Sequence, residues 1–182
     1  MHTRPKAEEK GKAGLGIWFL LFVLALIWGS SFIRMKRGLF DHGRPVFSPL
    51  QVAATRLAIA WLVLSPLLFK HARLLPANWR ALFVSGFFGN GLPAILFTVA
   101  QTRVSSAVAG VINSLSPLFT LVIGVLLYRS PVRMVHVMGV LLGLAGAAGL
   151  ILIGQRVEGV PVWYAGCAVL ATGCYGISAN VV

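Results

Sequence analysis

The sequence predicts an all-α integral membrane protein with about six transmembrane helices. Of its 182 residues, 58% are hydrophobic and only 11% are charged, and the mean hydropathy is +0.86. Soluble domains are about half apolar and about a quarter charged. The apolar residues form runs close to the roughly 20 residues that a helix needs to cross a bilayer. No run alternates at the two-residue period of strands, so these runs predict helices.

The first apolar run follows a polar, charged stretch, residues 1–14, which we expect to be a disordered cytoplasmic N-terminus. The run is too long for the apolar region of a signal peptide and has no small-x-small cleavage site, which indicates an uncleaved first span. Short loops predict that successive helices are antiparallel neighbours. The predicted spans are 17–39, 49–69, 81–100, 105–127, 134–153 and 162–182.

The basic residues lie mainly between the apolar runs. With a net charge of +12 the chain could suggest nucleic-acid binding, but this placement is typical of anchors at lipid headgroups. We therefore expect the lipid bilayer as a partner and no nucleic acid. An N-terminus inside the cell puts nine basic residues on the inner side (Arg4, Lys6, Lys10, Lys12, Lys70, Arg73, Arg80, Arg129 and Arg133). Six lie outside (Arg34, Lys36, Arg37, Arg44, Arg103 and Arg156), which favours a cytoplasmic N-terminus in a bacterial inner membrane.

The fourth and third spans each carry a proline beside polar residues near mid-depth. Pro117 has no N–H to give to the carbonyl of Asn113, and Ser114 and Ser116 are neighbours of that asparagine. In "GFFGNGLP", Pro93 similarly frees the carbonyl of Gly89, beside Asn90. Broken helices in a membrane persist only where protein or a water-filled cavity satisfies the freed groups. Two interpretations stay open, a substrate cavity and simple helix–helix packing through asparagine.

Other polar or aromatic residues at mid-depth raise the same two interpretations, a substrate cavity or helix–helix packing. Trp28 and Ser30 lie near the centre of the first span and Tyr175 lies in the sixth, too deep for interfacial anchoring. Arg56 is the one ionisable residue well inside a span, where a charge costs at least about 2.5 kcal/mol. It should therefore face the interior of the bundle, as part of a binding site or as a helix anchor. The candidate substrate-binding residues are Trp28, Ser30, Arg56, Asn90, Asn113, Ser114, Pro117 and Tyr175.

The acidic residues, Glu8, Glu9, Asp41 and Glu158, all lie outside the predicted spans, so no carboxylate can carry a proton within the membrane. The sequence has no nucleophile–base pair, zinc motif or glycine-rich phosphate loop. His136 stands alone at the start of the fifth span and is interpreted as interfacial packing. We expect neither an enzyme nor a resident cofactor or metal.

The chain also contains a weak internal repeat. "IWGSSF" at residues 27–32 aligns with "CYGISA" at residues 174–179, an offset of 147. The sixth helix would then restart the pattern of the first, and five helices per repeat would return in inverted orientation. The predicted organisation is an N-terminus (1–14), a first five-helix repeat (15–154), and a linker with the first helix of a truncated second repeat (155–182). Because the sixth segment ends without an anchor or cap, we expect an N-terminal fragment.

Four segments resemble the drug/metabolite transporter superfamily, in particular its EamA-type ten-helix members. They are "IWGSSFIRMK", "PLQVAATRLAIA", "AQTRVSSAVAGVINSLSPLFTLVIGVLL" and "GVLLGLAGAAGLIL". The resemblance implies two inverted five-helix repeats, cytoplasmic ends and a central substrate cavity, with Trp28, Arg56, Asn113 and Pro117 at matching positions. The chain departs from the family pattern after the fourth helix, where "YRSPVR" has no acid in place of the usual Gly-Glu pair.

The expected function is that of a secondary transporter moving a small metabolite, amino-acid derivative or drug by alternating access. Its partners would be a small-molecule substrate and either the missing second repeat or a second copy of the chain. Because Arg56 lies inside a span and no acidic residue does, an anionic or zwitterionic substrate is slightly favoured. Two rivals stay open. A small four-helix multidrug transporter would need a membrane carboxylate, and a truncated product or accessory subunit would not transport.

Overall fold

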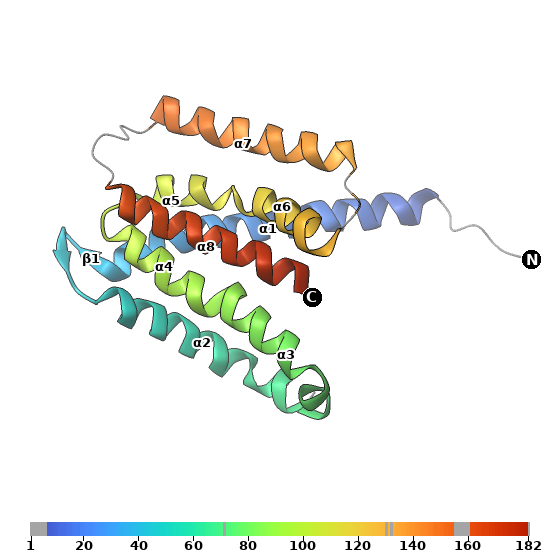
Figure 1. The fold of residues 1–182 in the computed structure, drawn as a ribbon, viewed down its shortest axis with the longest axis horizontal. Helices are drawn as coiled ribbons and strands as arrows, with labels where there is room; N and C mark the ends of the chain where they lie inside the picture. Colours follow the sequence, from blue (N-terminus) through green and yellow to red (C-terminus); the bar gives the residue numbers. More distant parts are fainter. Residues whose placement is uncertain (1–6, 71, 130, 132, 155–160, 182) are drawn as a thin grey trace, which may run out of the picture.

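A computed structural model describes residues 7–70, 72–129, 131, 133–154 and 161–181 of the chain (Figure 1). This part of the protein is helical except for one short hairpin. Five helical segments are long and apolar enough to cross a membrane, and a shorter apolar helix makes the sixth. The prediction of an all-α membrane protein with about six helices is confirmed.

The elements follow the predicted order along the chain. The helices are α1 (Ala7–Leu39), α2 (Pro49–Lys70), α3 (Leu75–Gly86), α4 (Leu92–Gln101), α5 (Ser106–Asn113), α6 (Ser116–Tyr128), α7 (Met134–Gly154) and α8 (Val162–Val181). A 3₁₀ turn, Ala72–Leu74, precedes α3, and a π-helical turn, Phe87–Gly91, joins α3 to α4. The strands β1 (Phe40–Asp41) and β2 (Arg44–Pro45) pair between α1 and α2.

The first helix begins earlier than its hydropathy indicates. We predicted a disordered stretch to residue 14, but α1 starts at Ala7, and only residues 1–6 lie outside the described part of the chain. Alanine, glutamate and lysine, which fill residues 7–12 apart from one glycine, are good helix formers. An existing helix extends through such residues at little cost, because nucleation has already occurred.

The third predicted span bends through a π-helical turn at Pro93. The N–H of Leu92 bonds to the carbonyl of Phe87, five residues back, rather than to the residue four back. A widened turn of this kind, common at functional sites, removes the clash that a proline ring makes inside an α-helix. The span from Leu75 to Gln101 therefore remains continuous although its middle is irregular.

The fourth predicted span divides into two helices. α5 ends at Asn113 and α6 begins at Ser116, with Pro117 in the first turn of α6, where a proline needs no hydrogen-bond partner. The hydroxyl of Ser116 donates to the carbonyl of Asn113 at 2.7 Å. The carbonyl that Pro117 leaves free is thus bonded within the chain.

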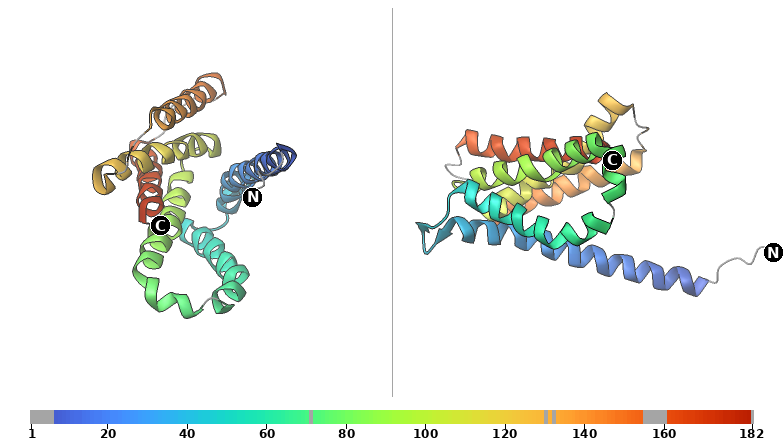
Figure 2. Two further views of the ribbon diagram at one scale, coloured as in Figure 1. Left: turned by 90° about the vertical axis from the view of Figure 1, so that its right-hand side faces the viewer. Right: turned by 90° about the horizontal axis from the view of Figure 1, so that it is seen from below.

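Helix α8 lies in the middle of the bundle, between α4 and α6, while α1 and α7 stand on its outside (Figure 2). Glycine permits this central packing. A Cβ atom at Gly176 would lie 2.8 Å from the carbonyl carbon of Phe119, so only glycine lets α8 approach α6 this closely. The last helix of the chain therefore completes the interior of the preceding five-helix segment.

Candidate functional site

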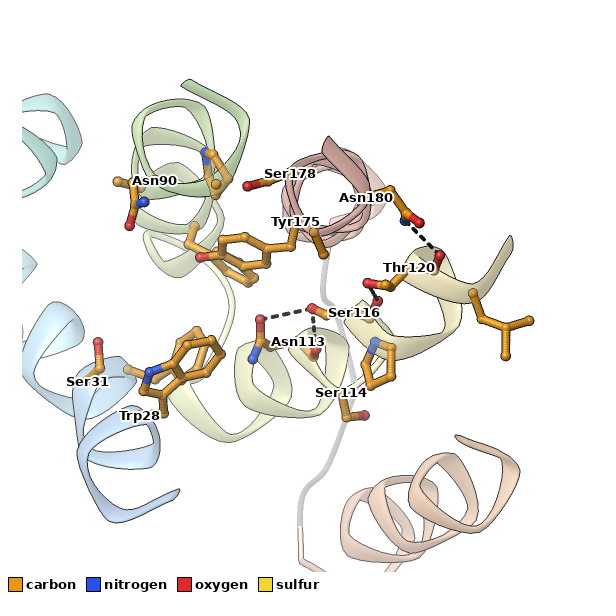
Figure 3. Close-up of a pocket in the computed structure, with 18 of the residues that line it drawn as sticks. Trp28, Ser31, Asn90, Asn113, Ser114, Ser116, Thr120, Tyr175, Ser178 and Asn180 are labelled. Atoms are coloured by element: carbon orange, nitrogen blue, oxygen red, sulfur yellow. Dashed lines mark hydrogen bonds between the residues drawn. The ribbon is translucent and has the colours of Figure 1, made fainter. Parts of the chain in front are cut away.

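A cavity of about 1090 Å³ lies among α1, α2, α4, α5, α6 and α8 and extends to α7. Its volume is slightly above the range for ligand pockets, about 300–1,000 Å³. Seven of the eight candidate residues line it: Trp28, Arg56, Asn90, Asn113, Ser114, Pro117 and Tyr175. In Figure 3 the side chains of Trp28, Asn113 and Tyr175 surround one space, although they come from three different helices. Whether these residues bind a substrate stays a prediction.

Ser30 is the candidate residue that the structure does not bring to the cavity. Its hydroxyl donates to the carbonyl of Ile27 at 3.0 Å, within its own helix. At 100° per residue, Ser30 lies about 200° around α1 from Trp28, whereas Ser31 lies about 60° from it. The cavity face of α1 therefore carries Trp28, Ser31, Phe32 and Met35, and Ser31 takes the place that we predicted for Ser30.

Arg56 reaches from α2 into the cavity and contacts α1. Its Nη2 atom donates a hydrogen bond to the Ser31 hydroxyl at 3.0 Å. Among the described residues that line the cavity, Arg56 is the only one with a permanent charge, and none is acidic. This positive charge meets no counter-ion there, so the cavity favours negatively charged groups electrostatically.

Side chains of α8 near Tyr175 form another wall of the cavity, and two of them were not among the residues predicted from the sequence. Ser178 donates to the carbonyl of Ser85 at 3.2 Å, and the Asn180 amide donates to the carbonyls of Thr120 and Gly176. Both lie on the cavity. Spacing of three residues from Tyr175 could have indicated Ser178, but nothing local indicated Asn180.

His136 also lines the cavity, at the start of α7. We interpreted it as interfacial packing because it stands alone in the sequence, yet its side chain is exposed on the cavity edge. The helix break before α7 places it there, and no spacing rule could have shown this. Within the described residues, no group of three or more His, Cys, Asp or Glu could hold a metal ion.

The two ends of the cavity differ. We call the end that carries β1, β2, the α4–α5 turn and the start of α8 the hairpin end. The main hydrophobic core lies at the hairpin end and consists of Met35, Leu39, Val52, Phe97, Ala100, Ala168 and Ala171. Lys36 also links helices there, since its Nζ atom donates to the carbonyls of Gln101 at 2.5 Å and Val104 at 3.3 Å. The core therefore closes the cavity at the hairpin end, whereas its lining extends at the other end to the exposed residues Pro131 and His136.

Gln101 completes the seal beside Lys36. Its side chain is fully buried, and its amide nitrogen donates to the carbonyl of Phe32 at 3.2 Å. The Ser106 hydroxyl donates to the same carbonyl at the same distance. Polar groups of the α4–α5 turn thus hold α1 firmly at this end.

The fold and the cavity define a multi-pass helical membrane protein with a polar central cavity. Comparison with known families identifies it further. Residues 15–152 match the EamA-like transporter family, and the chain belongs to that family. Membership places it in the drug/metabolite transporter class, as the resemblance in the sequence implied.

Two curated relatives support this assignment. An "Uncharacterized transporter" of Archaeoglobus fulgidus is 25% identical over 129 residues, which cover 71% of this chain and 45% of the relative. A WAT1-related protein of Arabidopsis thaliana is 32% identical over 107 residues, covering 53% of this chain and 30% of the relative. The chain thus spans less than half the length of either relative. No solved structure matches it.

Proposed function

We propose that this protein is a secondary transporter that moves a small metabolite, amino-acid derivative or drug by alternating access. The observation that supports this most is the central cavity, which lies beside the π-helical turn before Pro93 and the break between α5 and α6, next to the hydrophobic core of the hairpin end. Discontinuous helices that surround a mid-membrane cavity are typical of secondary transporters. A cavity open to one side corresponds to one of the two states that alternating access requires.

The proposed location is a bacterial inner membrane, with the N-terminus in the cytoplasm. The excess of basic residues on the N-terminal side supports this orientation. The cavity would then open toward the cytoplasm, because the N-terminus of α1 lies at the end opposite the hairpin (Figure 1). A reporter fused after Arg73 should be cytoplasmic, and one fused after Arg44 periplasmic. The reverse pattern would overturn the orientation.

The complete carrier would contain a second five-helix repeat or a second copy of this chain. Helix α1 supports this proposal because Trp18, Phe19 and Leu20, in its N-terminal half, are each more than 60% exposed. The greater length of both relatives agrees with it. The mass of the purified protein in detergent tests the second-copy form of the proposal. A dimer supports that form, and a monomer that transports contradicts it.

Transport itself can be tested with the 182-residue chain in liposomes loaded with amino acids, organic acids and amines. We expect saturable efflux of at least one compound, measured by mass spectrometry. Asn113→Trp should stop it, because the indole ring fills the cavity, while Leu62→Trp should not, since Leu62 is 62% exposed on α2. Efflux no faster than from protein-free liposomes would contradict transport by this chain, whether as one copy or as two.

A further inference from the structure

The cavity has a charged side and an aromatic side. Arg56 and Ser31 form the charged side, and their hydrogen bond holds the guanidinium next to α1. This bond occupies one N–H of Arg56, and a guanidinium has five. The remaining donors suit a planar, two-oxygen anion, since arginine binds carboxylates through two parallel N–H···O bonds.

Four rings from three helices form the aromatic side. The rings of Phe32 and Phe97 meet edge to face with centroids 5.3 Å apart, and Phe97 stacks on Tyr175 at 6.0 Å. Phe97 is only 1% exposed, so its ring is fixed by packing. Trp28 is 55% exposed and faces the same space (Figure 3). A flat apolar group could therefore lie against Trp28 and Tyr175, and because Phe97 already holds the Tyr175 ring, little side-chain entropy would be lost.

The two sides lie close enough for one small molecule to reach both. Arg56, Ser31, Phe32 and Tyr175 all line the same cavity, and Phe32 directly follows Ser31 on α1. A ligand with its acidic group on Arg56 would thus place its body on the aromatic rings. A second acidic group would find no further positive charge among the described lining residues.

From this arrangement we propose that the cavity binds small organic monoanions with a flat apolar body, the carboxylate on Arg56 and Ser31 and the body against Trp28 and Tyr175. This inference rests on the proposed function, for which it names the substrate class. Organic cations are rejected, because the described lining offers them a fixed positive charge and no acid. The ligand's charge also offsets part of the cost of burying Arg56 at mid-depth.

Equilibrium binding to the 182-residue chain in nanodiscs of zwitterionic lipid tests this inference without requiring transport. The probes are 2-naphthoate, neutral 2-naphthamide and cationic 2-naphthylmethylammonium, which share one ring system. We expect 2-naphthoate to bind at least tenfold more tightly than either of the others. Equal binding of acid and amide, tighter binding of the cation, or no binding of any probe would overturn the inference.

Two substitutions then assign the roles. Arg56→Met should reduce 2-naphthoate affinity to that of the amide and leave amide binding unchanged, which also shows that the variant is folded. Arg56→Lys should keep part of the preference for the acid. Trp28→Ala should weaken acid and amide alike. Arg37→Met is the matched control, because Arg37 is exposed at the end of α1 and does not line the cavity. An Arg56→Met protein that still prefers the acid contradicts the role of Arg56.

Flux of the same probes in liposomes separates this inference from the proposed function. Selective binding of 2-naphthoate without flux would support the anion site and contradict alternating access. Flux of the amine or the amide without flux of 2-naphthoate would support a carrier and overturn the substrate class.

Discussion

The hairpin end of the bundle and the opposite end are built from the same helices but packed differently. At the hairpin end the helices touch through small residues: Ala53, Ala100, Ala109, Ala168 and Ala171 are each at most 1% exposed. Toward the opposite end of α2, large side chains such as Trp61, Leu62 and Phe69 are more than 60% exposed. At the hairpin end these alanines are therefore inside, together with a few large residues such as Phe97, whereas many large apolar residues elsewhere are outside.

This difference follows from the solvent. Lipid tails are as apolar as leucine, so burying a large apolar side chain between helices gains little in a membrane. Small residues let backbones approach, and polar contacts such as those of Lys36 and Gln101 then fix the seal. The four predictions that follow test this contrast.

The largest expected difference is in water access. In a protein whose Cys167 and Cys174 are replaced by alanine, cysteines at Asn90 or Asn113 should react with a polar thiol reagent about 100-fold faster than cysteines at Ala100 or Ala109, because the thiolate reacts and needs water to form. Alkylation rates measured by mass shift check this. A cysteine at Leu62 serves as the control for lipid-facing positions. Cavity positions as inert as that control would contradict an open cavity.

The second prediction compares one substitution at both ends. Leu39→Ala at the hairpin end should lower the free energy of unfolding by about 2 kcal/mol, near the lower limit for buried leucines, since lipid replaces water as the reference solvent. Leu62→Ala, at an exposed site on α2, should change it by less than about 0.5 kcal/mol. Unfolding in mixed micelles measures both. Equal losses would show that the two ends are packed alike.

The third prediction compares two glycines of α8. Gly176→Ala should lower the free energy of unfolding by about 1–2 kcal/mol, because the added methyl group meets the backbone of Phe119. Gly166 has no atom within 4 Å of its would-be Cβ, so Gly166→Ala should be neutral or stabilise α8 by up to about 1 kcal/mol. Unfolding in mixed micelles measures the free-energy change of both variants. A stabilising effect at Gly176 would refute the close approach of α8 to α6.

The smallest effect is expected for Lys36. Lys36→Gln should cost about 1 kcal/mol, since glutamine can still reach one carbonyl and water near the membrane surface can bond to the other. It should also raise the alkylation rate of a cysteine at Ala100. Arg37→Gln, at the exposed neighbouring position, should leave both quantities unchanged. If the two variants behave alike, Lys36 does not seal the hairpin end.

Much of the architecture could be predicted from the sequence. The six spans agree with the structure apart from the start of α1 and up to six residues at the start of the third span, because their length is set by bilayer thickness and local hydropathy. The irregular turn before Pro93 and the helix break before Pro117 follow from the chemistry of proline. The same local reasoning found seven residues that line the cavity, since polar side chains at mid-depth avoid lipid and face the interior of the bundle.

Only the tertiary structure determined which side chains face the cavity, because this depends on how each helix is rotated and on its neighbours. Hydropathy gives the depth of Ser30 and Ser31 but not which of them faces Arg56. The position of Pro117 shows that the carbonyl of Asn113 loses its helical donor, but not that the Ser116 hydroxyl donates to this carbonyl instead. The central place of α8, and with it the roles of Ser178 and Asn180, depends on contacts between residues 60 to 93 positions apart. The sequence by itself therefore determined how deep each residue lies in the membrane. Only the packed bundle determined the direction in which each side chain points, because this depends on neighbours that are distant in the sequence.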